Sequence, residues 1–365
     1  MSFVEKPPLS IEPPDDTPVY FATLIAGLEL IVADEVEERL PAAQVLGALR
    51  GKLVFASPEP PGAALALGTI EHLFAWVGQI EALPTSREGL AVIERELEAL
   101  DLGPALALLH RLHGEPEQPS FRITAQRAGD HAYNSLEIAA AAGAGVNRRY
   151  GWAVDLTQYD YDVRVYVTDD SALVGLRLSE EALHRRARVR HAAASLNPTV
   201  AHAMCRLAAP SARQVFVDPM CGAGTILVER AALGEVGLLV GGELYEQPLA
   251  AARENLAAAQ VEGELVRWDA RRLPLRRGGV DAVACNLPWG RRVGSHRANR
   301  HLYPGFMREL GRVLRPGGVA VLLTQEKRLL GRLLAKSGKL TLAEQYPLSL
   351  SGMYPAIYVL TRDAD

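Results

Sequence analysis

The sequence predicts an α/β protein with a Rossmann-like C-terminal domain, preceded by a ferredoxin-like α+β domain and a second α/β domain. Three observations predict this fold class. From residue 214 onward, short apolar segments alternate with helical segments, the pattern of a doubly wound sheet. Residues 17–82 follow the order βαββαβ of a split ferredoxin-like unit. The 365 residues, 48% hydrophobic and 22% charged, suffice for two or three buried cores and exclude a disordered chain.

The first domain is predicted to span residues 17–82. Residues 1–16, which precede it, carry four prolines and few apolar side chains, so we expect a disordered tail there. Within the domain, apolar side chains recur at helical spacing between residues 27 and 40. The predicted elements are, in order, a strand at 19–24, a helix at 27–40, strands at 44–49 and 52–57, a short helix at 61–68 and a strand at 71–80.

The second domain is predicted to span residues 88–182. It begins with two short helices that break at Asp101–Pro104, because aspartate, glycine and proline interrupt the helical pattern there. The remaining predicted elements are a strand at 120–127, a helix at 135–151 and strands at 153–156, 161–167 and 171–178. A basic linker, residues 183–194, leads to the last domain.

Residues 195–365 form the predicted Rossmann-like domain. A helix over about 195–208 precedes the first strand, and a Ser351-Gly352 turn joins two strands within 339–362. The strands of the doubly wound part are predicted at 214–218, 237–243, 263–268, 280–286 and 319–324, with helical segments between them.

Composition and termini predict a cytoplasmic protein. No run approaches the ~20 apolar residues of a membrane span, and the first residues lack the basic and apolar regions of an export signal. The three cysteines, Cys205, Cys221 and Cys285, form no CxxC pair, so we expect neither a disulfide framework nor a zinc site. His110 and His113 lie one helical turn apart, but no further ligand stands beside them, so no metal is predicted.

The net charge of −4 conceals an asymmetry. Residues 1–101 carry a net charge of −11 and residues 102–365 a net charge of +7. Such a split indicates a polyanionic partner for the basic part, although chance clustering on a solvated surface explains the charge alone equally well. The basic residues are almost all arginine, which matches phosphate in a bidentate geometry.

The strongest local motif is the turn that leaves the strand at 214–218. It reads DPMCGAGT from Asp218 to Thr225, and its glycines let the backbone approach a ligand closely. The third glycine of a dinucleotide fingerprint is replaced by Leu227, and a phosphate loop would need GK[ST]. The turn therefore suits a ligand with an ammonium, a carboxylate and a ribose. A tight structural turn is the alternative interpretation.

Two carboxylates follow at the ends of the next two strands. Glu243 ends the second strand, where an acid can hold a ribose diol, and Asp269 follows the third, where an acid can accept from an adenine amino group. Either acid alone is more often a surface residue. Because ligands bind at the carboxyl ends of such strands, the pair indicates a binding site.

The fourth strand ends in the motif Asn286-Leu287-Pro288-Trp289. An amide oxygen and a carbonyl next to a proline can accept both hydrogens of one exocyclic amine, and an indole can stack on the base that carries it. Held in this way, the nitrogen can become tetrahedral and attack a methyl group. Taken alone, the motif is better explained as an ordinary proline turn with a core tryptophan.

These motifs together resemble a class I S-adenosylmethionine-dependent methyltransferase of the amino-methylating branch. DPMCGAGT, the two acids and NLPWG match the motifs of its catalytic domain over residues 195–365. Residues 88–182 resemble a THUMP domain, through FRITAQRAGDH, the helix after it and YDVRVYVTDDSALVGLRL. Such proteins carry a ferredoxin-like domain ahead of THUMP, as residues 17–82 predict.

The resemblance implies S-adenosyl-L-methionine as cofactor and RNA as partner. The catalytic residues would be Asn286, Pro288 and Trp289. The cofactor-binding residues would be Asn197, Thr199, Asp218, Cys221, Gly222, Gly224, Thr225, Glu243, Asp269, Ala270 and Asn286. The RNA-binding residues would be Arg122, Arg127, Arg185, Arg186, Arg188 and Arg190. The basic segment 291–301 is expected to form a flexible loop near the target nucleotide.

Within this family, the wording of the fourth motif favours a tRNA (guanine-N2)-methyltransferase of the acceptor-stem type, acting at tRNA position 6. Relatives acting at position 10 usually read D-P-P-Y and ribosomal RNA relatives N-P-P-Y, whereas Leu287 stands at the first proline here. The expected partner is the acceptor stem and 3′ end of tRNA, and a monomer is expected. The alternatives are methylation of ribosomal RNA or of tRNA position 10, an RNA-binding protein with an inactive methyltransferase domain, and an NAD-dependent enzyme.

Overall fold

The computed structural model describes residues 14, 17–183, 196–290 and 295–364. They fall into two compact units: residues 14, 17–23 and 33–183 form the first, and residues 24–32, 196–290 and 295–364 form the second. The predicted tail and basic linker lie almost entirely outside the described residues. None of the described helices is long and apolar enough to cross a membrane.

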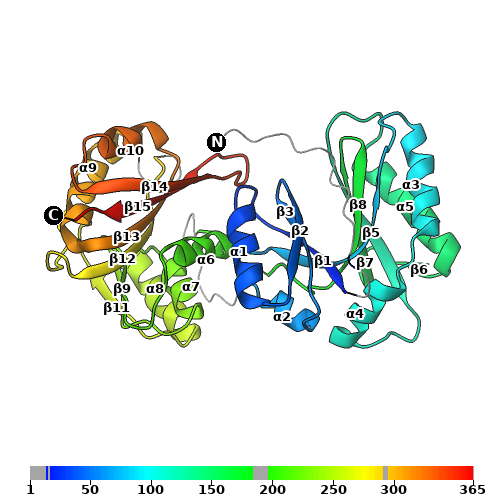
Figure 1. Cartoon of the computed structure of the whole chain (residues 1–365), viewed down its shortest axis with the longest axis horizontal. Coiled ribbons are helices and arrows are strands. Elements are labelled where there is room, and N and C mark those ends of the chain that lie inside the picture. The colour runs from blue at the N-terminus through cyan, green and yellow to red at the C-terminus, as the bar shows by residue number, and fades with distance from the viewer. Residues whose placement is uncertain (1–13, 15–16, 184–195, 291–294, 365) are drawn as a thin grey trace. The chain divides into compact units, whose positions relative to one another are not determined.

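The first unit is built on one mixed sheet of eight strands, in the order β2-β3-β1-β4-β8-β7-β5-β6 (Figure 1). The predicted βαββαβ order of the ferredoxin-like region is confirmed. The elements of this region are β1 Val19–Thr23, α1 Glu29–Arg39, β2 Gln44–Leu49, β3 Lys52–Ala56, α2 Pro61–Leu65 and β4 His72–Ile80. Those that follow are α3 Glu88–Ala99, α4 Gly103–His113, β5 Ser120–Ala128, α5 Ser135–Tyr150, β6 Ala153–Val154, β7 Tyr161–Thr168 and β8 Ser171–Arg177.

The ferredoxin-like and THUMP regions, predicted as separate domains, share this sheet. Strand β4 of the first region pairs antiparallel with β8 of the second, from Phe74↔Arg177 to Ile80↔Ala172. Which strand pairs with the free edge of another depends on tertiary structure. Hydropathy patterns along the chain therefore do not predict this pairing.

The two faces of the eight-stranded sheet differ. Helices α4 and α5 contact strands β4, β5, β7 and β8. A buried cluster on the opposite face consists only of strand residues, among them Phe21, Phe74 and Tyr166. Since side chains alternate between faces along a strand, Asp162 and Arg164 lie on the same face as Tyr166.

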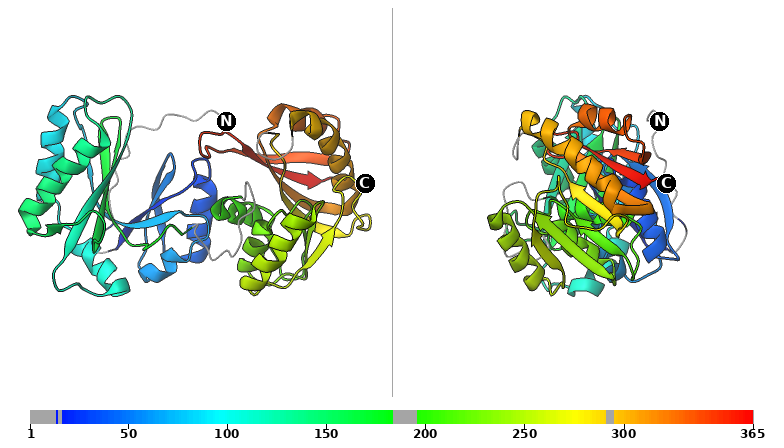
Figure 2. Two further views of the ribbon diagram at one scale, coloured as in Figure 1. Left: turned by 180° about the vertical axis from the view of Figure 1, so that it is seen from behind. Right: turned by 90° about the vertical axis from the view of Figure 1, so that its left-hand side faces the viewer.

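The second unit is a doubly wound sheet of seven strands, in the order β11-β10-β9-β12-β13-β15-β14. Strands β11, β10, β9, β12 and β13 run parallel, and β15 is antiparallel to both of its neighbours. Helices α6, α7 and α8 lie on one face of the sheet and α9 and α10 on the other (Figures 1 and 2). The elements are α6 Pro198–Leu207, β9 Val215–Asp218, α7 Thr225–Ala232, β10 Leu238–Glu243, α8 Glu246–Ala258, β11 Glu264–Arg267, β12 Val280–Asn286, α9 His296–Val313, β13 Leu314–Thr324, α10 Lys327–Leu334, β14 Leu340–Pro347 and β15 Ala356–Arg362.

The five strands predicted for the doubly wound part are confirmed. One expectation in this unit is wrong: residues 296–301 of the predicted loop 291–301 form the first turns of α9. Ser295 caps this helix, its side chain accepting a hydrogen bond from the Ala298 backbone N–H. Residues 291–294 lie outside the described residues.

Candidate active site

Three of the predicted site residues, Asp218, Glu243 and Asn286, lie at the carboxyl ends of neighbouring strands of the seven-stranded sheet. In the parallel registers, Asp218 is opposite Gly241, which lies two residues before Glu243, and Glu243 is opposite Arg267. Asn286 ends β12, which pairs with β9 on the other side. Strand order reverses between β9 and β12, and ligands of open α/β sheets bind at such a point.

The glycine turn after β9 has a conformation that depends on its glycines. Gly222 and Gly224 have φ values of +51° and +80°, which favour glycine. A Cβ on Gly224 would lie 2.8 Å from Leu256 Cδ1, so this glycine lets helix α8 approach. A Cβ on Gly222 would meet nothing within 4 Å, so the open side of the turn faces free space.

Asp218 is a buried acid directly before this turn. Its side chain accepts a hydrogen bond of 3.2 Å from the Met220 backbone N–H, and the residue is only 1% exposed. Burial, together with the nearby Glu243 carboxylate, raises the pKa of Asp218 to about 8. A cationic ligand would favour its ionised form.

Glu243 joins the end of β10 to the glycine turn. Its Oε2 accepts from the Gly222 N–H at 3.2 Å, and its Oε1 accepts from the Leu244 N–H at 2.8 Å. These bonds fix the carboxylate beside the turn, and a carboxylate has acceptor sites for further donors.

Asp269 is already paired with a neighbour that the sequence motif did not reveal. The Arg271 guanidinium donates to both carboxylate oxygens, at distances of 2.6–3.0 Å, and the Arg271 backbone N–H donates at 2.9 Å. The side-chain bond from Arg271 lowers the pKa of Asp269. An adenine amino group would therefore share this acid with Arg271.

Trp268 supports the glycine turn after β9, a contact that the sequence motifs did not predict. Its indole N–H donates to the Pro219 carbonyl at 3.0 Å. A Cβ on Gly242 would lie 1.7 Å from Trp268 Cε2, so the ring packs directly on the strand backbone. The GG pair before Glu243 is the sequence signal for this close approach.

Several residues that were predicted to contact the cofactor form hydrogen bonds within the protein or are buried. Asn197 caps α6: its Oδ1 accepts from the Thr199 N–H at 2.9 Å and from the Thr199 hydroxyl at 2.8 Å. Thr199 is fully buried, and Cys221 and Ala270 are 6% and 5% exposed. Thr225 is the first residue of α7. Cofactor contact by these residues stays a prediction.

The predicted catalytic motif, residues 286–289, forms a loop at the end of β12 that hydrogen bonds hold in place. The Trp289 indole N–H donates to Asn286 Oδ1 at 3.1 Å. Because an indole nitrogen only donates, this bond assigns the oxygen of the Asn286 amide to that side. The Pro288 carbonyl accepts from Asn299 Nδ2 and from the Tyr303 hydroxyl, each at 2.7 Å. Both lone pairs of the Pro288 carbonyl oxygen are thus already accepting hydrogen bonds. A substrate amine would have to donate to another carbonyl of the loop.

Arg122 belongs to an arginine cluster around Asp162, on the face of the eight-stranded sheet that carries Tyr166. Asp162, with 3% side-chain exposure, pairs with Arg122 at 2.8 Å, Arg164 at 2.9 Å and Arg177 at 3.6 Å. Three guanidinium groups against one carboxylate leave a net positive charge. The Arg122 guanidinium also lies 3.8 Å from the ring centre of Tyr159.

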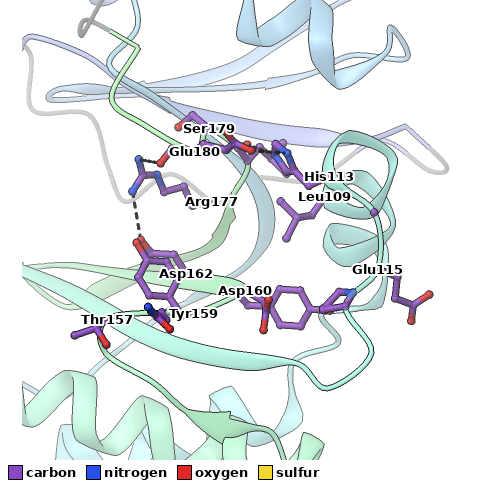
Figure 3. A pocket seen from close by; sticks show the side chains of 15 residues that line it. Leu109, His113, Glu115, Thr157, Tyr159, Asp160, Asp162, Arg177, Ser179 and Glu180 are labelled. Atoms are coloured by element: carbon purple, nitrogen blue, oxygen red, sulfur yellow. Dashed lines mark hydrogen bonds and ion pairs between the residues drawn. The ribbon is translucent and has the colours of Figure 1, made fainter.

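A cavity of about 500 Å³ opens beside this cluster, and Asp162, Arg177 and Tyr159 belong to its lining (Figure 3). Arg177 donates to the Glu180 carbonyl and pairs with Asp162 across one wall. Of the other predicted RNA contacts, Arg127 donates to the Gly129 carbonyl at 2.8 Å. Arg185, Arg186, Arg188 and Arg190 lie outside the described residues.

Comparisons with known proteins place these features in a family. Residues 185–354 match the RMKL-like methyltransferase domain and residues 103–177 the THUMP domain. A Thermus thermophilus protein named tRNA (guanine(6)-N2)-methyltransferase is 32% identical over 344 residues, 93% of this chain and 98% of that protein. The chain belongs to the THUMP-domain tRNA (guanine-N2)-methyltransferase family. The family confirms the predicted fold and S-adenosyl-L-methionine as the predicted cofactor.

Further members support this assignment. The Bos taurus protein tRNA (guanine(6)-N(2))-methyltransferase THUMP3 is 37% identical over 264 residues, which cover 68% of this chain and 52% of that protein. The chain thus spans about half the length of the first mammalian relatives that it matches. The crystal structure of TrmN from Thermus thermophilus superposes with a TM-score of 0.78 at 31% identity, covering 94% of this chain and 99% of that one.

Proposed function

We propose that this THUMP methyltransferase transfers a methyl group from S-adenosyl-L-methionine to the exocyclic N2 amine of a guanosine in tRNA, at position 6 of the acceptor stem. The observation that carries the proposal is the fixed Asn286 amide oxygen at the strand-order reversal, beside the Asp218 and Glu243 carboxylates. The names of the family members supply the base and the nucleotide position.

The residues at the strand ends fit the cofactor. The open space at Gly222 admits a ligand against the backbone, and Asp218 suits a positively charged group. Glu243 would hold the ribose, and Asp269, shared with Arg271, would accept from the adenine amine. When bound, the cofactor supplies a methyl group activated by a sulfonium.

The catalytic loop holds the acceptor amine without acting as a base. The Asn286 amide is neutral, so its oxygen can accept an N–H of the amine but cannot take its proton. The N–C bond would form as the S–C bond of the sulfonium breaks to leave a neutral thioether, and the methylated nitrogen would then release its proton to water. One Oδ1 lone pair accepts from Trp289, which leaves the other for the amine. The indole face can stack on the guanine. Catalysis then rests on positioning of the nitrogen rather than on a covalent intermediate.

The arginine cluster supports contact between the eight-stranded sheet and the RNA backbone. Arg122 was predicted to bind RNA, and Asp162 brings Arg164 and Arg177 beside it. Guanidinium groups match phosphate geometry. The base to be methylated must leave its helix, which costs a few kcal/mol; phosphate contacts offset this free energy.

In vitro methylation tests the function. The full chain would be incubated with labelled S-adenosylmethionine and transcribed tRNA that carries G6, and the nucleosides and the modified position would then be analysed. We expect N2-methylguanosine at position 6 and no labelling of a matched transcript with A6. Equal labelling of the A6 transcript, or preferential labelling of ribosomal RNA, would contradict the proposed target.

A further inference from the structure

We propose that Tyr303 and Asn299 of α9 are positioning residues for the methyl transfer, holding the Pro288 carbonyl so that Trp289 can fix the Asn286 amide. The inference rests on the proposed function for the reaction whose rate is measured. The hydrogen bonds from which it is argued do not depend on that function. Tyr303 lies outside every motif that the sequence singled out, and Asn299 lies in the segment 291–301 that was expected to form a loop.

The hydrogen bonds between these residues form a chain with one direction. The Tyr303 hydroxyl has a single hydrogen, which the Pro288 carbonyl accepts at 2.7 Å. The bond of 2.8 Å between Tyr303 Oη and Thr324 Oγ1 must therefore be donated by Thr324. Thr324 Oγ1 in turn accepts from the Glu326 N–H at 2.9 Å. The Pro288 carbonyl thereby fixes the donor direction of the hydroxyl on α9, and Thr324 at the end of β13 supplies the hydrogen that this hydroxyl accepts.

A second side chain, that of Asn299, also donates to the Pro288 carbonyl. Asn299 Nδ2 donates to the Pro288 carbonyl at 2.7 Å and lies 3.3 Å from Glu326 Oε1. Asn299 is 1% exposed, and Tyr303 and Thr324 are fully buried, so water does not compete for these bonds. Asn299 and Tyr303 are four residues apart and thus share one face of α9.

The loop is also held after Trp289. Gly290 has a φ value of +72°, and a Cβ there would lie 2.7 Å from the His296 backbone N and 3.1 Å from Glu326 Oε1. The loop is therefore held at the Pro288 carbonyl and closely packed at Gly290. The Trp289 ring between these points has little freedom, and its indole N–H reaches Asn286 Oδ1.

This arrangement separates the residues that bind the cofactor from those that position the acceptor amine. Apart from Asn286, the predicted cofactor residues lie on or after β9, β10 and β11 and at the start of α6, whereas the chain of donors joins α9, β13 and the loop after β12. Loss of a donor to Pro288 should move Asn286 relative to the amine and leave those other cofactor contacts unchanged. The effect should therefore appear in the rate of the transfer step rather than in either dissociation constant.

The experiment combines kinetics with a readout that needs no reaction. Full-length Tyr303→Phe would be compared with the wild type in single-turnover methylation at saturating tRNA and cofactor. In parallel, indole N–H resonances of ¹⁵N-tryptophan-labelled protein would be recorded without ligands. Trp289→Phe identifies the Trp289 signal among the four tryptophans. We expect transfer about tenfold slower, unchanged dissociation constants, and a shifted Trp289 resonance with faster hydrogen exchange.

Matched variants separate positioning from general destabilisation. Tyr133→Phe removes a comparable buried bond, from the Tyr133 hydroxyl to the Pro84 carbonyl at 2.9 Å in the first unit, and should leave both readouts unchanged. If Tyr303→Phe fails to fold, Thr324→Val and Thr324→Ser test the same chain. The valine variant should slow transfer and shift the indole signal, and the serine variant should restore both.

Either a wild-type rate or an unmoved Trp289 resonance in Tyr303→Phe, or in Thr324→Val if the former does not fold, would overturn the proposal. Failure of the proposed function looks different. If the wild type methylates another amine, the rates are compared on that substrate. If it methylates none, the indole resonance alone decides whether Tyr303 positions Trp289.

Discussion

The Asp218 carboxyl gives the methyltransferase domain a stability that depends on pH. In an unfolded chain this group ionises near pH 3.9, but in the folded protein burial raises its pKa to about 8. Between these values the native state binds more protons than the unfolded state, so the free energy of unfolding falls as the pH rises. One such group contributes at most about 1.4 kcal/mol per pH unit.

Asp218→Asn should remove this dependence. The variant keeps an oxygen for the Met220 N–H, yet has no charge to bury. We expect it to be more stable than the wild type at pH 8 and to differ less at pH 5. Cofactor affinity of the wild type should rise from pH 6 to pH 9, and the variant should bind more weakly. Urea denaturation and cofactor titration at each pH provide the measurements; parallel stability profiles would contradict the assignment.

The second prediction for a single residue concerns Asn286. Asn286→Ala should slow single-turnover methylation at least about 100-fold, because the acceptor is needed mainly in the transition state. RNA affinity should barely change, and Asn286→Asp should retain more activity since a carboxylate oxygen can still accept from the amine.

Asn147→Ala is the matched control for Asn286→Ala. It removes an amide that donates to the Trp152 carbonyl in the first unit, whereas Asn286 belongs to the second. An Asn286→Ala enzyme as fast as this control would exclude the motif as the catalytic site.

At the scale of elements, helix α6 depends on its N-cap. Asn197→Ala should lower the free energy of unfolding by about 1 kcal/mol, because the Thr199 N–H and hydroxyl lose their acceptor. Asn197→Ser preserves the cap and should preserve stability. If Asn197 also contacts the cofactor, as the family resemblance implies, the serine variant will bind cofactor more weakly at unchanged thermal stability.

The strand ends of the doubly wound sheet could be predicted from sequence, whereas the partners of their side chains could not. Alternating elements and polar residues after apolar strands locate Asp218, Glu243 and Asn286. The pairing of Asp269 with Arg271 depends on a loop conformation that no periodicity encodes.

Helix α9 was missed at its start because its first turns are rich in arginine and histidine and lack an apolar stripe. The start of α9 could have been predicted from polar residues in the sequence. Ser295 is a cap residue, and Asn299 and Tyr303 stand four residues apart. Their buried roles depend on the Pro288 carbonyl, which only the tertiary structure brings to them.

For the molecule as a whole, the arginine cluster should contribute to the salt dependence of RNA binding. Full-length Arg122→Gln leaves Asp162 paired with Arg164 and Arg177, so the fold should persist. Loss of one phosphate contact should weaken tRNA binding and flatten the slope of log affinity against log salt by about 0.7–0.9. Affinities from 50 to 200 mM salt give this slope.

Arg148→Gln is the control for this measurement. It removes an exposed arginine of the same unit that pairs with Glu94 and Glu98, and it should leave the salt slope of RNA binding unchanged. Equal slopes for Arg122→Gln and the wild type would argue against RNA contact at the cluster.

The pairing of β4 with β8 has a consequence for synthesis on the ribosome. Ile80 leaves the ribosome about ninety residues before its partner Ala172. At translation rates of roughly 5–20 residues per second, the ferredoxin-like strands wait several seconds with one edge unpaired. Such an edge is a template for aggregation, so the nascent chain should be most sensitive to chaperone depletion between these two points. Ribosome-stalled chains ending before and after β8 would show this as a loss of protease sensitivity at β4.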